Sequence, residues 1–390
     1  MGTTILVRVS GPDGPGITAG IMDVLAGDGV EILDVEQVVL HGRLELGLLI
    51  EVPEGRSTVK ELLFFGWQRG VHLDFEVVDG SPQRRGAESV VTVIGTAVEP
   101  AGFGAVARAI ADGGGNIDRI AQIATYPVIS YELAVSGGDT EAMRRGLGAA
   151  SKEHQIDLAI QPEGLFRRAK RLVVMDVDST LIQGEVIELL ASQIGVGAEV
   201  ARLTAEAMSG DHDFETSLRE RVALLAGATE GDLERVRGQI QLTPGARTFV
   251  RTLHRLGMKV AVVSGGFSVF TDRLKTDLGL EHAVANRLEV VDGVVTGRLE
   301  GPVVDRAGKA RVLREIAESE GIPLAQTVAV GDGANDIDML SVAGLGIAFN
   351  AKPVVSEAAD TSLSVPYLDA ILFLLGIRRH DVETADLISP

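Results

Sequence analysis

The chain has 390 residues, which is long enough for two or three domains with a sizeable core. Its formal net charge of −19 argues against a nucleic-acid-binding protein, because phosphate backbones require a basic surface. It contains no cysteine, which excludes disulfides and thiolate metal sites. No apolar run reaches the ~18 residues that a membrane helix needs, and the first residues do not resemble a signal peptide. We therefore expect a soluble cytoplasmic protein with no nucleic-acid and no membrane partner.

The first part of the chain, residues 1–80, predicts a βαββαβ unit. Alternating apolar residues indicate strands at 4–9, 31–39, 44–52 and 72–78. Apolar residues at helical spacing indicate one helix after residue 16 and another around residues 59–63. The stretch between the first strand and the first helix is dense in turn-forming residues.

The same pattern returns about 85 residues later, over residues 88–163, which indicates an internal duplication. Strands are expected at 90–94, 129–135 and 156–161, and Ile120-Ala-Gln-Ile repeats the earlier Val35-Glu-Gln-Val. A polar linker, residues 81–86, joins the two copies.

Both copies resemble ACT domains, which are small modules that bind amino acids at paired interfaces. In the first copy, Gly11, Asp13 and Gly16 form a Gly-x-Asp-x-x-Gly loop similar to the ligand loop of that family. By this resemblance the three residues would hold a regulatory amino acid, with its carboxylate at a free helix N-terminus and its ammonium group on Asp13. The alternative is that they simply form the turn. The second copy keeps only Gly102 of this loop, so we expect it to contribute structure or an interface.

The third part of the chain, residues 170–390, follows a basic hinge and predicts a Rossmann-like α/β fold. Short apolar runs at 172–175, 259–263, 327–330 and 345–349 are typical of buried parallel strands. The segment 185–242 has helical periodicity throughout, and we interpret it as a small helical cap inserted after the first strand. Thr243 and Pro244 predict the start of the next helix, as N-cap and first helical residue.

Polar residues follow three of these strands. The first ends at Asp176 and Asp178, which can both face the crevice at the carboxyl end of the sheet. Taken alone, an Asp-x-Asp pair could also be a polar turn or the metal-binding motif of a glycosyltransferase. The other two strands end in Ser264-Gly265-Gly266 and in Gly331-Asp332-Gly-Ala-Asn335-Asp336. Shared placement at one edge of the sheet favours a single functional site over three unrelated turns.

These residue types supply what phosphoryl transfer requires, which is mainly positioning and charge neutralisation. Asp176 is the candidate nucleophile, and Asp178 is the candidate general acid and base. We expect Mg2+ as cofactor, because this cation prefers oxygen ligands. The candidate metal ligands are Asp176, Asp178 and Asp332, and the candidate phosphate ligands are Ser264, Gly265, Lys309 and Asn335. Asp336 is expected to orient Lys309 or water molecules on the metal.

The four motifs, in this order, resemble those of the haloacid dehalogenase superfamily. Within it, residues 170–380 resemble the phosphoserine phosphatases, and tandem ACT modules before the enzyme resemble the actinobacterial type. This resemblance implies Mg2+-dependent hydrolysis of phosphoserine, the last step of serine biosynthesis. It also implies that Glu185 binds the substrate ammonium group, that Arg221 binds its carboxylate, and that Met208 and Phe214 close over it. Glu185 and Arg221 could otherwise lie on a solvated helix face.

Two other functions stay open at this point. One is a phosphatase for another small phosphorylated metabolite, such as phosphothreonine. The other is an amino-acid-sensing module with an incidental phosphatase half, although the intact motifs argue against it. Two ACT-like modules also suggest a homodimer, because exposed sheet edges tend to be covered by pairing. An amino-acid effector such as serine could then act by shifting the assembly between states.

Overall fold

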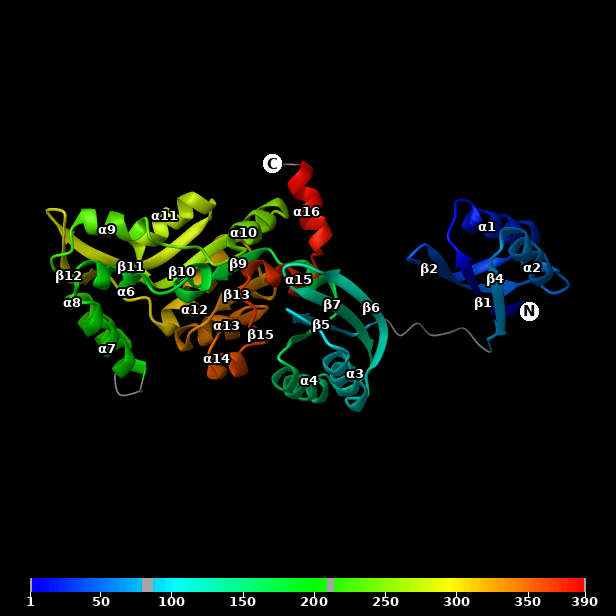
Figure 1. Ribbon diagram of the computed structural model, residues 1–390, viewed down its shortest axis with the longest axis horizontal. Helices are drawn as coiled ribbons and strands as arrows, with labels where there is room; N and C mark the ends of the chain where they lie inside the picture. Colours follow the sequence, from blue (N-terminus) through cyan, green and yellow to red (C-terminus); the bar gives the residue numbers. More distant parts are fainter. Residues whose placement is uncertain (1, 79–86, 209–213, 389–390) are drawn as a thin grey trace. The chain divides into compact units, whose positions relative to one another are not determined.

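The computed structural model describes residues 2–78, 87–208 and 214–388, and the side chains of residues 166, 205–208, 214 and 388 are excluded from the description. The chain divides into two compact units, Met1–Arg85 and Gly86–Pro390 (Figure 1). Among the described residues, no helix is both long enough and apolar enough to cross a membrane.

The first unit is a sheet with strand order β2-β3-β1-β4 and two helices. Its elements are β1 (Thr3–Pro12), α1 (Ile17–Asp28), β2 (Glu31–Leu40), β3 (Arg43–Val52), α2 (Thr58–Arg69) and β4 (His72–Val77). Alternate residues of β1 and β3, such as Val7 and Leu48, are fully buried and pack with Ile21 and Leu62 of the helices. The predicted βαββαβ fold is therefore confirmed, with its core on the helical side of the sheet.

The second unit begins with a sheet of the same kind, in the order β6-β7-β5-β8. Its elements are β5 (Ser89–Gly95), α3 (Pro100–Asp112), β6 (Asn116–Ala124), β7 (Ile129–Ser136), α4 (Thr140–His154) and β8 (Asp157–Pro162). Unlike β1, which alternates, β5 is buried at every residue. One side packs on α3 and α4, whereas Ile94 and Ala159 on the other side share an apolar cluster with Val173 of the following region. The second copy is thus docked on the rest of its unit.

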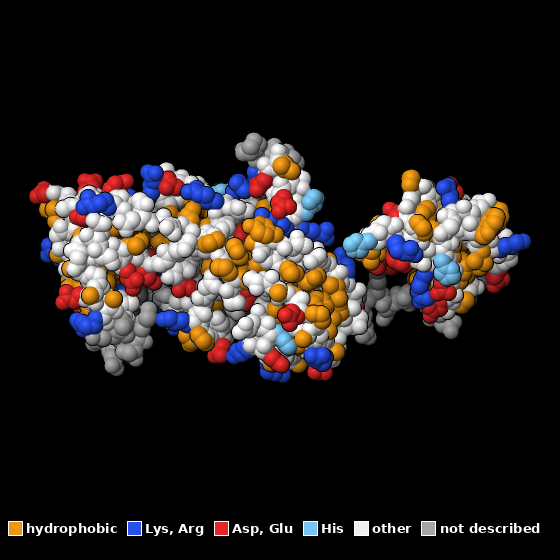
Figure 2. Space-filling model, in the orientation of Figure 1, with side chains coloured by type: hydrophobic (Ala, Val, Ile, Leu, Met, Phe, Trp, Pro, Cys, Tyr) orange, Lys and Arg blue, Asp and Glu red, His pale blue; other side chains and the backbone are white. Residues whose placement is uncertain are grey.

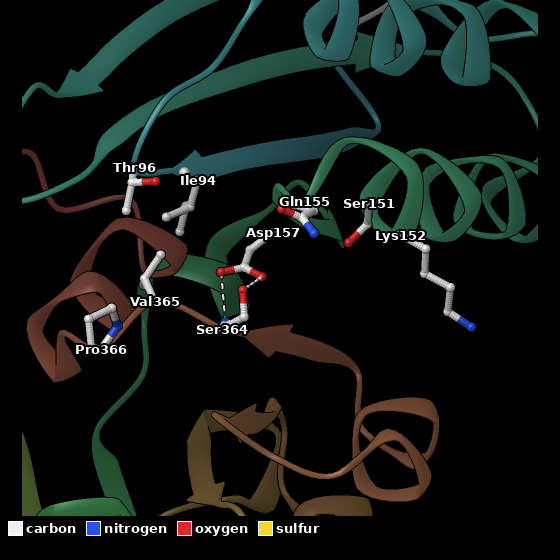
Figure 3. Close-up of a pocket in the computed structure, with 10 residues that line it drawn as sticks. Ile94, Thr96, Ser151, Lys152, Gln155, Asp157, Ser364, Val365 and Pro366 are labelled. Atoms are coloured by element: carbon white, nitrogen blue, oxygen red, sulfur yellow. Dashed lines mark hydrogen bonds between the residues drawn. The ribbon is translucent and has the colours of Figure 1, made fainter.

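Polar contacts reinforce this junction. The carboxylate of Asp157 accepts hydrogen bonds from the backbone N–H (2.7 Å) and the hydroxyl (2.8 Å) of Ser364 (Figure 3). A cavity of about 440 Å³, lined by residues of both regions, lies beside this pair. The expected basic hinge contains the short helix α5 (Leu165–Arg168), in which Arg167 is buried and paired with Glu132 of β7. This segment is therefore held to β7 by a buried ion pair.

The remaining strands form a mixed sheet in the order β12-β11-β10-β9-β13-β14-β15, in which the pair β11–β12 is antiparallel and the other described pairs are parallel. The strands are β9 (Leu172–Met175), β10 (Lys259–Phe267), β11 (His282–Val291), β12 (Val294–Glu300), β13 (Thr327–Gly331), β14 (Gly346–Phe349) and β15 (Thr361–Leu363). Leu172 and Val174 of β9 pack with Leu313 on one face, and Val173 packs with Phe249 on the other. This is the predicted Rossmann-like core.

Helices cover both faces of this sheet, and further helices form a cap (Figure 1). The core helices are α10 (Ala246–Arg255), α11 (Ser268–Leu278), α12 (Arg306–Ser319), α13 (Ile337–Val342), α14 (Pro353–Ala358), α15 (Ile371–Leu374) and α16 (Arg379–Ile388). The cap helices are α6 (Val186–Gln193), α7 (Gly197–Met208), α8 (Phe214–Ala223) and α9 (Glu230–Arg237). Backbone hydrogen bonds join Gly227 and Ala228, between α8 and α9, to Val295 of β12.

The predicted start of α10 is wrong. The helix begins at Ala246, with Gly245 as its N-cap in a left-handed conformation (φ 81°). Thr243 does not cap the helix because its backbone N–H donates to Leu181 O (3.0 Å) and its hydroxyl donates to Thr180 O (2.7 Å). The segment therefore supports the loop that follows β9.

Candidate active site

Three neighbouring strands, β10, β9 and β13, carry the polar motifs at their carboxyl ends. Because the strands are parallel and adjacent, Asp176, Ser264 and Asp332 meet at one edge of the sheet. This is the position at which open α/β sheets bind ligands. The chain also adds β10 on one side of β9 and β13 on the other, so the connections leave β9 in opposite directions at this edge.

Lys309, from the first turns of α12, lies at the centre of the site. Its Nζ is 2.8 Å from Asp176 Oδ1 and 2.7 Å from Asp336 Oδ1, and its side chain is 0% exposed. Burial lowers the pKa of Lys309, but the two carboxylates outweigh this effect and raise it overall, so the side chain stays charged. The expectation that Asp336 orients Lys309 agrees with this geometry.

Three carboxylates could hold a metal ion. One oxygen each of Asp176, Asp332 and Asp336 lie within 4.8 Å of one another. Burial, the Asp336 charge and the Asp178 charge raise the pKa of Asp176 well above its usual range, against the opposing charge of Lys309. Burial and Asp336 raise the pKa of Asp332 to about 6. Such a concentration of buried negative charge requires cations, and oxygen donors of this kind suit Mg2+.

The carboxylate of Asp178 is not part of this group of three. It accepts hydrogen bonds from the N–H of Val186 (2.8 Å) and from the hydroxyl of Ser264 (3.0 Å). Burial raises the pKa of Asp178, and these two hydrogen bonds oppose the shift. A carboxyl group with a raised pKa holds its proton more readily than usual, which fits the role of a general acid.

The carboxyl end of β10 is held in shape by a hydrogen bond within the strand and by one buried side chain of β11. Gly266 N–H donates to Ser264 Oγ (2.7 Å), and a Cβ at Gly266 would lie 2.7 Å from Asp178 Oδ2. Asn286 of β11 donates to Gly265 O (2.7 Å) and accepts from Val304 N–H (2.8 Å). Asn286 is not among the site residues predicted from the sequence, because no strand is expected over residues 282–291.

Thr180 was also missed as a site residue. Its hydroxyl donates to Asp332 Oδ1 (3.1 Å), so it ties the loop after β9 to the end of β13. Its position four residues after Asp176, in a run of two hydroxyl residues, was the available signal. Asn335 lies half-buried beside Asp336 on the same loop.

The cap contributes two charged groups near these carboxylates. Burial, Asp178 and Asp332 raise the pKa of Glu185, which lies at the N-terminus of α6, to about 7. Burial lowers the pKa of Arg221 in α8, and the nearby charge of Glu185 opposes that shift. Arg221 is held by Ser217 O (3.3 Å) and Thr204 Oγ1 (3.5 Å). The side chains of Met208 and Phe214 lie outside the described residues.

The proposed effector loop belongs to the other unit. Gly11 is the penultimate residue of β1, and a Cβ there would lie 2.9 Å from Val71 Cγ1, so packing requires a glycine. The N–H of Asp13 donates to Gly42 O (2.8 Å), and its side chain is exposed. Gly16 has a φ of 86° and precedes α1, and no side chain in the described part of the chain caps this helix.

Comparison with known families agrees with this architecture. The haloacid dehalogenase-like hydrolase family matches residues 173–341, and ACT domain families match residues 3–76 and 87–161. The two ACT matches correspond to the two βαββαβ sheets, and the hydrolase match spans β9 to α13.

Two relatives match along nearly the whole chain. A phosphoserine phosphatase of Streptomyces coelicolor is 52% identical, covering 99% of this chain and 95% of that protein. The phosphoserine phosphatase SerB2 of Mycobacterium tuberculosis is 48% identical, covering 98% and 95%.

Solved structures show the same relationship. A probable phosphoserine phosphatase of Vibrio cholerae, in unliganded form, has a TM-score of 0.59 at 34% identity and covers 76% of this chain and 88% of its own. A substrate-bound phosphoserine phosphatase complex has a TM-score of 0.50 at 46% identity, covering 52% and 97%.

Proposed function

Because the chain belongs to the phosphoserine phosphatases of the haloacid dehalogenase superfamily, we propose that it hydrolyses O-phospho-L-serine to L-serine and phosphate with Mg2+ as cofactor. The observation that carries the proposal is the convergence of Asp176, Asp178, Lys309 and Asp332 at the carboxyl ends of adjacent strands. We further propose that this reaction is the last step of serine biosynthesis and takes place in the cytoplasm.

Asp176 acts as the nucleophile in this mechanism. Its carboxylate oxygen forms a bond to phosphorus as the bond between phosphorus and the serine oxygen breaks. Asp178 gives its proton to the serine oxygen, and serine leaves. Asp178 then takes a proton from water, which attacks phosphorus and releases the phosphate from Asp176. The raised pKa of Asp178 supports this double role.

Charge neutralisation is supplied from several sides. Lys309 offsets the charge of Asp176 and of the phosphoryl group, and Asp336 keeps the lysine in place. Asp176, Asp332 and Asp336 are the residues that would hold Mg2+, with Asp178 retained as a further candidate. When bound, the ion would withdraw charge from the phosphoryl oxygens. Ser264, the amides of Gly265 and Gly266, and Asn335 are the proposed phosphate ligands.

Selectivity for phosphoserine is assigned to the cap. Glu185 and Arg221 are charged groups close enough to shift each other's pKa, and Glu185 also senses the charges of Asp178 and Asp332. A carboxylate matches the substrate ammonium group, and a guanidinium matches the substrate carboxylate. Met208 and Phe214 are proposed to close over the substrate, as the family resemblance implies.

Regulation and assembly are assigned to the ACT modules. We propose residues 1–80 and 88–163 as the two ACT domains and 170–390 as the enzyme with its cap at 185–242. Serine or a related amino acid would bind at Gly11, Asp13 and Gly16, where an uncapped helix N-terminus suits a carboxylate.

A homodimer through these modules is supported by the first unit's surface, on which apolar side chains are exposed (Figure 2). β2 forms one edge of its sheet, and Val35 (48% exposed) and Leu40 (58% exposed) lie on it. An apolar edge strand is a surface that proteins tend to cover by pairing. A second copy of the chain is the proposed partner.

The test is phosphate release from L-phosphoserine with Mg2+ and after its removal by a chelator. We expect turnover that depends on Mg2+, and a kcat/KM for phosphoserine well above that for phosphothreonine and for p-nitrophenyl phosphate. Equal kcat/KM values for the three esters would contradict the substrate assignment while leaving the phosphatase chemistry intact.

A further inference from the structure

A series of contacts runs from the second ACT domain to the loop that carries Asp176. It begins at Tyr126, between β6 and β7, whose ring centroid lies 5.5 Å from the guanidinium carbon of Arg379 at the start of α16. A guanidinium over an aromatic ring is attracted by the negative face of the ring. This contact crosses the junction between the ACT domain and the enzyme within one unit.

Arg379 is also the cation that faces a buried carboxylate. Its Nη1 lies 3.0 Å from Asp369 Oδ2, while its Nε pairs with Glu383 one turn along the helix. Asp369 is 4% exposed, and its Oδ1 is buried without a hydrogen-bond partner among the described residues. A buried carboxylate that loses its cation is strongly destabilised, so Asp369 depends on Arg379.

Asp369 in turn packs against the segment before α10. A Cβ at Gly245 would overlap Asp369 Oδ1, so the carboxylate lies directly over this glycine. The N–H of Leu368 donates to Pro244 O (2.8 Å). The position of residues 368–369 therefore determines the position of Pro244 and Gly245.

The preceding residue reaches the catalytic loop. Thr243 donates through its hydroxyl to Thr180 O (2.7 Å) and through its N–H to Leu181 O (3.0 Å). Thr180 then donates through its own hydroxyl to Asp332 Oδ1 (3.1 Å). The series thus ends at one of the carboxylates that could hold the metal.

We propose that Arg379 is a positioning residue through which the second ACT domain, by way of Tyr126, sets the geometry of the catalytic loop and of Asp332. Loss of the guanidinium leaves Asp369 without its cation, and the displaced carboxylate moves Pro244 and Gly245. Thr243 then loses its alignment with Thr180, and the metal site is distorted. The inference rests on the proposed function only in taking Asp332 as a Mg2+ ligand.

The experiment compares Mg2+ binding by the full chain, measured by titration calorimetry without substrate, across Arg379→Met, Tyr126→Leu and the double variant. The Mg2+ concentration for half-maximal hydrolysis of p-nitrophenyl phosphate gives a second readout. Arg378→Met is the matched control, because it removes the same charge from the neighbouring exposed position. Tyr126→Phe is the control for the ring, because it keeps the aromatic face.

We expect Mg2+ binding to weaken about threefold to tenfold in Arg379→Met and by less in Tyr126→Leu. The double variant should bind Mg2+ with the same affinity as Arg379→Met, because both changes act through one contact. Both controls should bind Mg2+ like the wild type. Tyr126 is 65% exposed, so its replacement keeps the proposal testable even where Arg379→Met fails to fold.

Three results would overturn the proposal. One is a lower Tm in Arg379→Met together with unchanged Mg2+ binding, which would make the residue merely structural. Another is unchanged Mg2+ binding in Tyr126→Leu, which would remove the ACT domain from the series. The third is a wild type that binds no Mg2+. A wild type that binds Mg2+ but does not hydrolyse phosphoserine would contradict the proposed function alone, since the comparison of Mg2+ affinities stands without turnover.

Discussion

Asp176 and Asp178 follow the same strand but contact different residues. We therefore predict that replacing each of them impairs catalysis in a different way. Asp176 faces Lys309, and Asp178 is held by Val186 and Ser264. We expect Asp176→Asn to abolish turnover and the acid-stable phosphoenzyme, because the nucleophile is gone. Asp178→Asn should still bind substrate but slow both half-reactions by roughly 10²–10⁴-fold, the usual contribution of a general acid or base. Steady-state kinetics and trapping of labelled phosphoenzyme check both. Near-normal kcat in Asp176→Asn would exclude the covalent mechanism.

The raised pKa of Glu185 predicts that the pH dependence of kcat/KM differs between substrates with and without an ammonium group. With a pKa of about 7 in the free enzyme, Glu185 is protonated below that pH and ionised above it. Only the ionised form attracts the substrate ammonium group, so kcat/KM for phosphoserine should rise as the pH rises through about 7. The profile for p-nitrophenyl phosphate, which has no ammonium group, should lack this limb, and Glu185→Gln should remove it for phosphoserine. If the limb survives in Glu185→Gln, another group is responsible for it.

Replacing Arg221 is predicted to lower kcat/KM chiefly for substrates that carry a carboxylate. The guanidinium is partly buried and held by Ser217 and Thr204, so it is already oriented. We expect Arg221→Ala to lower kcat/KM for phosphoserine by the equivalent of about 2–5 kcal/mol, as when one partner of a buried charge pair is removed. The loss for p-nitrophenyl phosphate should be small. Arg219→Ala is the matched control, because Arg219 lies on the same helix and pairs with Glu215 at an exposed position. Equal losses for both esters would place Arg221 outside the substrate site.

At the level of elements, the end of β13 depends on a glycine. A Cβ at Gly331 would overlap the carboxylate of Asp336, which holds Lys309. We expect Gly331→Ala to displace Asp336 and to lower kcat more than it raises KM, because Lys309 would lose its orientation. Gly148→Ala in α4 is the control, since a Cβ there meets nothing within 4 Å. Kinetics beside thermal unfolding separate lost activity from lost stability. Unchanged kcat in a folded Gly331→Ala would show that the loop adapts.

Some of these elements can be predicted from the sequence and others cannot, for physical reasons. The strands β9, β10 and β13 are short apolar runs that end in polar residues, and burial on both faces makes such runs easy to find. The hairpin β11–β12 is not predicted, because the exposed side chains of Val290, Val291 and Val294 obscure the alternation of apolar and polar residues. Its Asp292-Gly293 turn, with φ values of 50° and 76°, was the signal that could have revealed it. The start of α10 was misplaced because Thr243 bonds to residues 63 and 62 positions earlier in the chain, at Thr180 and Leu181. Local sequence patterns do not reveal contacts between residues that are so far apart in the chain.

At the level of the whole molecule, the two ACT copies differ in their surroundings. The second copy packs its open sheet face on the enzyme, which makes β5 buried throughout. The first copy belongs to a separate compact unit and keeps the Gly-x-Asp-x-x-Gly loop. A duplicated sequence pattern predicts two similar folds, but it does not predict that the second copy packs on the enzyme, because that depends on residues far away in the chain. The first copy is therefore the better candidate for an effector.

This difference predicts that the response to serine depends on Asp13. Its side chain is exposed, and Asp13 lies four residues before α1, whose N-terminus has no cap from a described side chain, so an ammonium group and a carboxylate could be held together there. We expect Asp13→Ala to lose the change in activity that added serine causes, each variant being compared with its own rate without serine. Asp23→Ala, at an exposed position of α1, is the matched control and should respond like the wild type. Serine that competes at the active site would inhibit wild type and Asp13→Ala alike. An identical response of the two would therefore exclude this loop as the sensor and leave its glycines a role in the turn alone.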